Sequence, residues 1–168
     1  MLVEIDKLDG VNSKLTDIFW TGRWDYMVWN EKEKIMERTY VMLKPDAVKR
    51  GLIGEIIARI EAKGYRVAGA KMMQLDPVIL REHYAHVKDQ SFYPGMEDYM
   101  MSGPVLAMIV EGENVVQGAR ILTGATKFED AKPGTIRGDY AMTTTQNLIH
   151  SSDTVDNAEI EINRFFGQ

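Results

Sequence analysis

The chain has 168 residues, of which 45% are hydrophobic and 27% charged, a composition that fits one globular domain with a core of ordinary size. Its formal net charge of −5 argues against a nucleic-acid partner or an anionic membrane surface. It has no cysteine, which excludes disulfides, thiolate metal sites and thiol nucleophiles.

Residues 1–36 differ from the rest of the chain because they hold all three tryptophans, Trp20, Trp24 and Trp29. An ordered segment does not leave three large aromatic side chains in water, so we expect a packing arm over its own domain or a neighbouring subunit. A binding site for another protein and a cloning or start-site artefact are the alternatives. The segment lacks the pattern of a secretory signal or a transit peptide, and no apolar run approaches the ~20 residues that span a bilayer. We therefore expect a cytoplasmic protein without a membrane anchor, with its domain in residues 37–168.

The first half of the domain alternates strands and helices. Residues 38–43 form a β-rich run that predicts a central strand, and it ends at Lys44 because a proline follows. The next helix carries isoleucines on one face and ends at a glycine, before a second strand over 65–74. Asp76 then stands as an N-cap before a proline, which opens a helix to about residue 86.

The second half contains one more long strand before the last motif. Pro94 opens a short helix that ends near Met101. Residues 104–110 are almost wholly apolar, which is typical of a strand that is buried on both faces. Residues 114–122 read as a helix, and we expect residues 124–138 to form a long loop.

The stretch from residue 147 to 153, Asn-Leu-Ile-His-Ser-Ser-Asp, predicts a short buried strand that ends in polar groups. A helix follows over residues 154–166, with Ser152 or Asp153 expected as its N-cap. Its apolar face consists of Val155, Ala158, Ile162, Phe165 and Phe166. Such a strand would hold the imidazole of His150 rigidly beside a helix N-terminus, where free N–H groups and the helix dipole attract anions.

Neither the Walker sequence nor the glycine-rich dinucleotide fingerprint is present, so a phosphate site in this chain must be built from side chains. The candidates are Lys44 at a strand end, Arg120, Thr126 and Arg137. Arginine forks suit phosphate because two parallel N–H donors match two oxygens. Taken singly, each of these four residues would be interpreted as a solvated surface group.

Five segments resemble, in the same order, the motifs of nucleoside diphosphate kinases. They are YVMLKPD (40–46), EHY (82–84), SGP (102–104), KPGTIRGD (132–139) and NLIHSSD (147–153). The similarity runs from about residue 37 to residue 166. The order of elements indicates an α+β sandwich of the ferredoxin-like kind, a four-stranded antiparallel sheet with helices packed on it. The family resemblance, and not periodicity, supplies the strand order.

The resemblance also implies roles for individual residues. His150 would be transiently phosphorylated, with Glu161 hydrogen-bonded to its ring and Ser152 beside them. The hydroxyl of Tyr84 would lie near the transferred group, and Phe92 would stack on the base. The implied phosphate and ribose ligands are Lys44, Arg120, Thr126, Arg137 and Asn147.

Physical chemistry gives reasons for two of these roles. One ring nitrogen of His150 must be held by an acceptor so that the other keeps its lone pair for attack. Glu161 lies about two turns into the last helix, on the side that could face the strand end, although an ordinary exposed glutamate is the alternative. Stacking on Phe92 suits an enzyme indifferent to the base, because every base has a π-face.

The chain departs from the family pattern at three places. Gln90-Ser91 replaces the usual Arg-Pro, which removes a charge beside the base. Ser151 stands where the family has glycine or alanine, and Thr144 occupies an often apolar position. These departures leave the base preference open.

We expect no metal site built from protein ligands. His83 and His86 lie three residues apart with Asp89 nearby, and we interpret them as surface histidines. The Mg²⁺ that the resemblance implies would be held mainly by nucleotide phosphates. Nucleoside di- and triphosphates would be the substrates of a homo-oligomer, hexamer or tetramer.

A non-catalytic nucleotide-binding or scaffold domain on the same fold is the alternative function. The presence of His150 together with Lys44, Arg120, Arg137 and Asn147 argues against it.

Overall fold

The computed structural model describes residues 36–167, where four strands form one antiparallel sheet in the order β2-β3-β1-β4. The strands are β1 (Met36–Leu43), β2 (Arg66–Met73), β3 (Val105–Glu113) and β4 (Ile149–Ser151). The expected α+β sandwich with an antiparallel sheet is confirmed. The arm expected over residues 1–36 lies outside the described residues, apart from Met36 at the start of β1.

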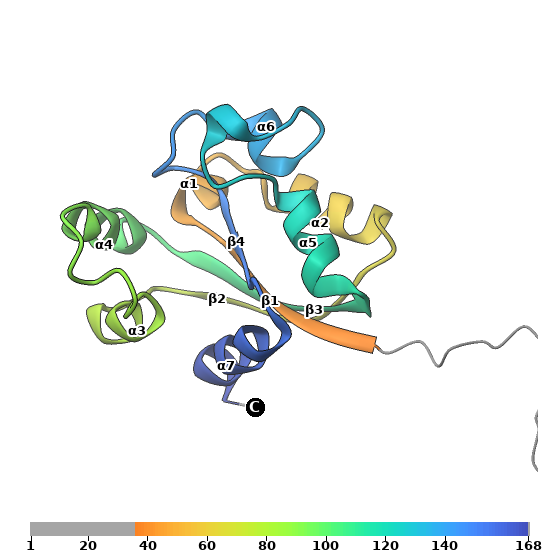
Figure 1. Ribbon diagram of the computed structural model, residues 1–168, viewed down its shortest axis with the longest axis horizontal. Helices are drawn as coiled ribbons and strands as arrows, with labels where there is room; N and C mark the ends of the chain where they lie inside the picture. The colour runs from red at the N-terminus through yellow and green to blue at the C-terminus, as the bar shows by residue number, and fades with distance from the viewer. Residues whose placement is uncertain (1–35, 168) are drawn as a thin grey trace, which may run out of the picture. The chain divides into compact units, whose positions relative to one another are not determined.

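Seven α-helices and one 3₁₀ helix are found in this range. They are α1 (Pro45–Lys49), α2 (Ile53–Ala62), α3 (Pro77–His83), α4 (Tyr93–Met101), α5 (Val115–Thr123), η1 (Phe128–Asp130), α6 (Ile136–Tyr140) and α7 (Val155–Phe166). Figure 1 shows α2 and α5 on one face of the sheet and α3 and α7 on the other. None of the helices between residues 36 and 167 has the length and apolar character needed to cross a membrane.

The sheet separates two hydrophobic cores, and β1 contributes to both. Tyr40 and Met42 pack with α3, α4 and α7, whereas Val41 and Leu43 pack with α1, α2, α5 and α6. All four side chains are at most 1% exposed. Successive side chains of a strand point to opposite faces, so this all-apolar run is the pattern expected of a strand covered on both sides.

The segment predicted as a loop over residues 124–138 contains secondary structure. Helix α6 begins after Thr135, whose hydroxyl accepts a hydrogen bond from the backbone N–H of Gly138 at 3.0 Å. A Cβ on Gly138 would lie 2.0 Å from the carbonyl oxygen of Lys132, so only glycine fits this turn. The prediction of a plain loop was wrong because a five-residue helix has no room for a 3.6-residue apolar pattern.

The predicted N-cap of α7 was also wrong. Thr154 caps the helix, and its hydroxyl accepts from the backbone N–H of Asn157 at 3.1 Å. Ser152 is instead bonded to β1 and α7, and the carboxylate of Asp153 accepts from the side-chain amide of Asn157. Val155, expected on the buried face, is 45% exposed.

The remaining boundaries follow the predictions closely. The side chain of Asp76 caps α3 by accepting from the N–H groups of Val78 and Ile79. That helix ends at His83, three residues earlier than expected, because Tyr84 leaves the helical conformation. Helix α1, which the sequence patterns did not reveal, turns the chain immediately after β1.

Candidate active site

The site begins where β1 and β4 run side by side. His150 lies opposite Met42 in the antiparallel register, which places its side chain beside the end of the central strand. The backbone N–H of Lys44 donates to the carbonyl of Leu148 at 2.8 Å, and Leu148 has a positive φ of 70°. This hydrogen bond fixes the position at which β4 begins. It joins the residue after β1 to the residue before β4, although the two are distant in sequence.

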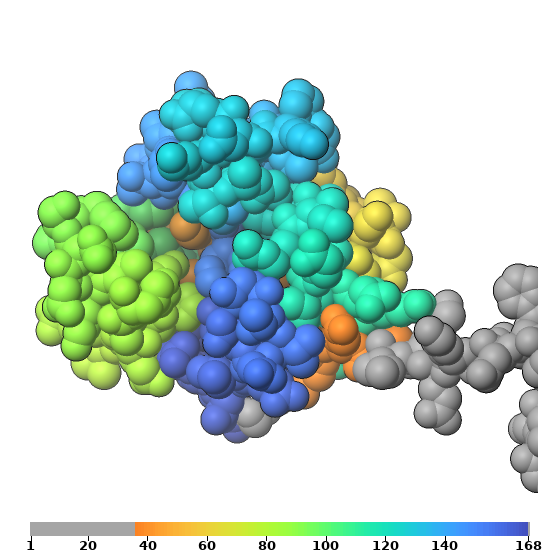
Figure 2. Space-filling model, in the orientation of Figure 1, coloured from red at the N-terminus to blue at the C-terminus, as the bar shows by residue number. Residues whose placement is uncertain are grey.

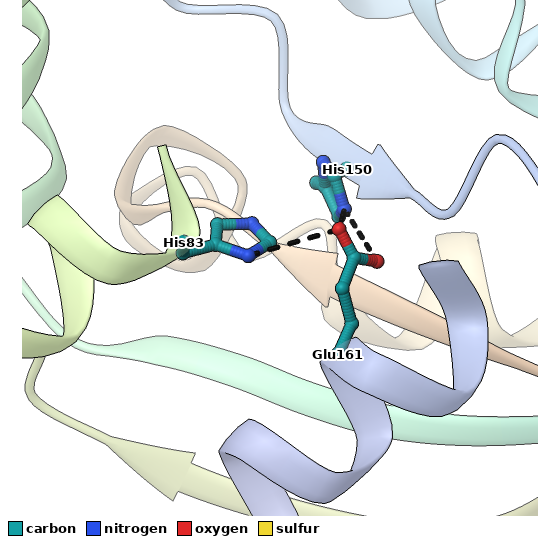
Figure 3. Close-up of side chains that lie close together, drawn as sticks. All are labelled: His83, His150 and Glu161. Carbon is teal, nitrogen blue, oxygen red and sulfur yellow. Dashed lines mark hydrogen bonds and ion pairs between the residues drawn. The ribbon is translucent and has the colours of Figure 1, made fainter. Parts of the chain in front are cut away.

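The ring of His150 is held by Glu161 of α7 (Figure 3). Its Nε2 lies 3.0 Å from each carboxylate oxygen, and the hydroxyl of Ser152 donates to the same carboxylate at 2.6 Å. Ser152 is itself fixed, because its oxygen accepts from the N–H of Tyr40 at 3.2 Å. An ionised carboxylate can only accept, so Nε2 carries a proton and Nδ1 keeps its lone pair. The ring therefore contacts α7 at Glu161, about two turns into the helix.

His83 is a member of this site that the sequence reasoning placed on the surface. It is 6% exposed, and its ring lies edge-on to that of His150 with centroids 4.8 Å apart. Burial, with smaller contributions from nearby positive groups, lowers the pKa of His83 to about 2, so its ring is neutral. The signal that could have revealed it is its spacing of three residues from Leu80, the other buried residue of α3. His86, by contrast, is exposed as expected.

Within residues 36–167 the group of histidines and carboxylates that could hold a metal consists of His83, His150 and Glu161, whose ligand atoms lie within 4.8 Å of one another. A guanidinium nitrogen of Arg164 lies 3.4 Å from Nδ1 of His83, and such a charge disfavours a cation there. We assign no metal to this group. His83, His86 and Asp89 form no such cluster in the described part of the chain.

Lys44 and Asn147 form the second part of the site. The Lys44 ammonium donates to the side-chain oxygen of Asn147 at 2.7 Å. The Asn147 amide nitrogen donates to the carbonyls of Thr144 and Thr126, at 2.9 and 3.4 Å. Burial, and then the charge of Arg137, lowers the pKa of Lys44 to about 8. The positive charges of Lys44 and Arg137 act on each other, and a site with two such cations favours an anion.

Arg137, on α6, is 8% exposed and bonded to three backbone carbonyls. Its guanidinium donates to the carbonyls of Gly124, Asn147 and Ile149, at 2.9, 3.3 and 2.6 Å. A guanidinium has five N–H donors, so two are left for a phosphate. Burial, followed by the charge of Arg120, lowers the pKa of Arg137 to about 10. Arg137 thus braces the strand of His150 in addition to the phosphate role that the resemblance implies.

The other predicted residues are distributed around the site. Tyr84 is buried, with its ring 4.5 Å from that of His83, and burial raises the pKa of its phenol so that it stays protonated. Phe92 precedes α4 and is 57% exposed. Arg120 and Thr126 are exposed, on α5 and on the segment after it. Figure 2 shows a recess between the green α3–α4 segment and the cyan-to-blue segment that follows α5.

Comparison with known proteins gives a consistent result. The family model described as nucleoside diphosphate kinase matches residues 37–168. A nucleoside diphosphate kinase of Acetivibrio thermocellus is 53% identical over 131 residues, which cover 78% of this chain and 96% of that protein. Human nucleoside diphosphate kinase A is 52% identical over 130 residues, which cover 77% of this chain and 86% of that protein.

Solved structures agree. The crystal structure of the Encephalitozoon cuniculi nucleoside diphosphate kinase matches with a TM-score of 0.77 and 46% identity, covering 79% of this chain and 90% of the other. The Halobacterium salinarum enzyme, in complex with CDP, has the same TM-score at 48% identity, covering 80% of this chain and 90% of the other. The matched family model, the identity of these relatives and the shared fold establish that the chain belongs to the nucleoside diphosphate kinase family.

Proposed function

We propose that this chain transfers the γ-phosphate of a nucleoside triphosphate to a nucleoside diphosphate through a phosphohistidine at His150. The observation that carries the proposal is the pairing of Nε2 with Glu161, which leaves the Nδ1 lone pair of a half-buried, rigidly held ring available. The family names of the relatives support the same activity.

In the first half-reaction Nδ1 of His150 attacks the γ-phosphorus in line. The nitrogen–phosphorus bond forms while the bond between the γ-phosphorus and its bridging oxygen breaks, and the electron pair leaves with the diphosphate. The ring becomes positively charged while its Nε2 proton stays on the hydrogen bond to Glu161, whose negative charge stabilises it. The second half-reaction reverses these steps with a different diphosphate, which gives a ping-pong cycle.

Positioning and charge provide most of the catalysis in phosphoryl transfer. The site has a half-buried cation, Lys44, and a buried one, Arg137, which has two free donors. We assign them to the transferred and adjacent phosphates. Arg120 and Thr126 would contact the remaining phosphate oxygens. The protonated hydroxyl of Tyr84 would donate to the moving group.

The donor set of this site fits a Mg²⁺ that arrives with the nucleotide. The carboxylate of Glu161 is occupied by His150 and Ser152, and that of Asp153 accepts from Asn157. The phosphates themselves would therefore be the main ligands, as is usual for this ion. When bound, Mg²⁺ neutralises phosphate charge, and no residue of the described site is assigned to it.

The exposed ring of Phe92 is assigned to the nucleobase, and Asn147 with Lys44 to the sugar hydroxyls. Stacking carries no information about base edges, so we propose a broad base specificity. The relative in complex with CDP supports nucleotide binding on this fold. Gln90, in place of an arginine, removes one charge from this side of the site.

We further propose a cytoplasmic homo-oligomer, a hexamer or tetramer, without a nucleic-acid or membrane partner. The acidic composition and the family resemblance support this assignment. The family match that begins at residue 37 supports dividing the chain into an extension, 1–36, and a kinase domain, 37–168.

Transfer from ATP to GDP tests the proposal. Initial rates measured against ATP at several fixed GDP concentrations should give parallel double-reciprocal lines, the pattern of a ping-pong cycle. Intersecting lines would contradict the covalent intermediate. Nucleotide binding without any transfer would contradict the catalytic assignment itself.

A further inference from the structure

Glu161 and Arg164 lie three residues apart on α7, a spacing at which opposite charges ordinarily pair along a helix. Arg164 is instead directed to α3. Its Nε donates to the carboxylate of Glu82 at 2.9 Å, and a terminal nitrogen lies 3.4 Å from Nδ1 of His83. Glu161 is directed the other way, to His150 and Ser152. The two charges are therefore drawn apart.

His83 occupies the space between them. Its Nδ1 is 3.7 Å from a carboxylate oxygen of Glu161 and 3.4 Å from the guanidinium of Arg164 (Figure 3 shows the side facing Glu161). A guanidinium can only donate, so Nδ1 accepts and the ring proton resides on Nε2. The ring is buried and uncharged, since burial lowers the pKa of His83 to about 2.

The Nε2 of His83 has no hydrogen-bond partner among the described residues, although the atom is buried. An unpaired buried N–H is unfavourable, and an apolar side chain would avoid it. What the structure does use at this position is the neutral Nδ1 of histidine, which accepts from Arg164. This points to a role in controlling where the guanidinium goes.

We propose that His83 is a neutral spacer that keeps Arg164 from pairing with Glu161 and so reserves the carboxylate for His150. It is a positioning residue for phosphotransfer, and its effect on the rate depends on the function proposed above. Without the spacer, the guanidinium of Arg164 would turn to Glu161 and form the pair that their spacing favours. The carboxylate would then accept less strongly from Nε2 of His150 and would stabilise the developing ring charge less well.

Four variants test this inference by the rate of His150 phosphorylation. H83A should lower the rate about tenfold, the lower range for loss of a group that orients another. H83A/R164M should recover most of that loss, because the competing cation is gone. H83N, which keeps a neutral acceptor near the Nδ1 position, and R164M alone should stay close to the wild type.

The matched control is Arg81, which lies on α3 and pairs with Glu97 of α4 at 3.2 Å. R81M removes an exposed helix–helix ion pair of the same kind, but within residues 36–167 Arg81 forms no hydrogen bond or ion pair with Glu161. H83A/R81M should therefore remain as slow as H83A. If R81M restored the rate of H83A as well as R164M does, the recovery would be a general effect on stability. That result would overturn the spacer role of His83.

A measurement without nucleotide separates this inference from the proposed function. The Nε2 proton of His150, observed by NMR with labelled histidine, should shift upfield in H83A as its hydrogen bond weakens, and return in H83A/R164M. An unshifted signal in H83A, or no return in the double variant, would overturn the spacer even if transfer is normal. Absence of transfer in the wild type would instead refute the proposed function and leave this measurement intact.

Glu82 allows a test that leaves the core unchanged, in case H83A does not fold. Its side chain is 62% exposed, and E82Q removes the negative charge that pairs with Arg164. With His83 still in place, the Nε2 signal of His150 should be unchanged. A shift in E82Q would mean that Glu82, and not His83, restrains Arg164, and would overturn the inference.

Discussion

Lys44 and Asn147 are joined by a 2.7 Å hydrogen bond, although 103 residues separate them in the sequence. Lys44 directly follows β1 and Asn147 immediately precedes the turn into β4. The bond therefore joins the ends of the two strands at the position where phosphates are proposed to bind. It also holds an ammonium group close to Arg137, with consequences for its titration.

Lys44 should take up a proton when nucleotide binds. Its pKa is lowered from 10.5 to about 8, so between these values the unfolded lysine holds a proton that the folded one has lost. This contribution makes the free energy of unfolding rise with pH across that window. The phosphates of ATP favour the charged form, so binding at about pH 8.5 should draw protons from the buffer.

Calorimetry in two buffers of different ionisation enthalpy measures this uptake. It should be largely lost in K44M, with the remaining binding weaker. Equal uptake by K44M and the wild type would show that Lys44 is not the group that titrates.

Glu161→Gln should slow transfer by roughly 10- to 100-fold, the usual cost of removing a group that orients another. The amide still reaches His150, but it lacks the charge that stabilises the ring as it becomes positive. Glu159→Gln on the exposed face of the same helix is the control. Rates for E161Q that match those of E159Q at every pH would show that Glu161 has no part in the reaction.

Phe92→Ala should raise the KM for nucleotides on the order of tenfold, since stacking on an aromatic ring contributes about 1–3 kcal/mol per base. The increase should be similar for all bases. Val78→Ala, which removes another exposed apolar side chain from the α3–α4 segment, should leave KM unchanged. An increase confined to one base would contradict the stacking role.

Residues 1–36 should contribute stability or subunit contacts and not catalysis. Burying two of the three tryptophans at about 25 cal/mol per Å² is worth several kcal/mol before ordering entropy is subtracted. A chain that begins at Met36 should keep its transfer rate at low temperature, yet melt earlier or change its mass in solution. Loss of activity at an unchanged melting temperature and mass would place part of the arm in the site.

The sequence was sufficient for the parts of this structure that local patterns determine. The apolar runs of β1 and β3 show burial on both faces, and Asp76 before a proline marks a helix start. His150 was identified through its flanking motif. The geometry that makes its Nδ1 the free nitrogen depends on Glu161, eleven residues away and on another element.

Other features depend on tertiary contacts and could not be predicted. Ser152 has the chemistry of an N-cap, but its hydroxyl is drawn to Tyr40 and Glu161, so Thr154 takes that role. The spacing of His83 from Leu80 could have shown that it faces the core, but only the packing of α3 against α7 makes it part of the site. Such competition between partners is decided by the fold as a whole.

The central claim is that Nδ1 of His150 accepts the phosphoryl group. Brief incubation with γ-labelled ATP, followed by denaturation, should leave an acid-labile, base-stable label on the peptide that contains His150. His150→Ala should bind nucleotide, carry no label and lose several powers of ten in transfer rate, whereas the exposed-residue variant His86→Ala should behave as the wild type. A label retained on His150→Ala, or found on another residue of the wild type, would contradict the account.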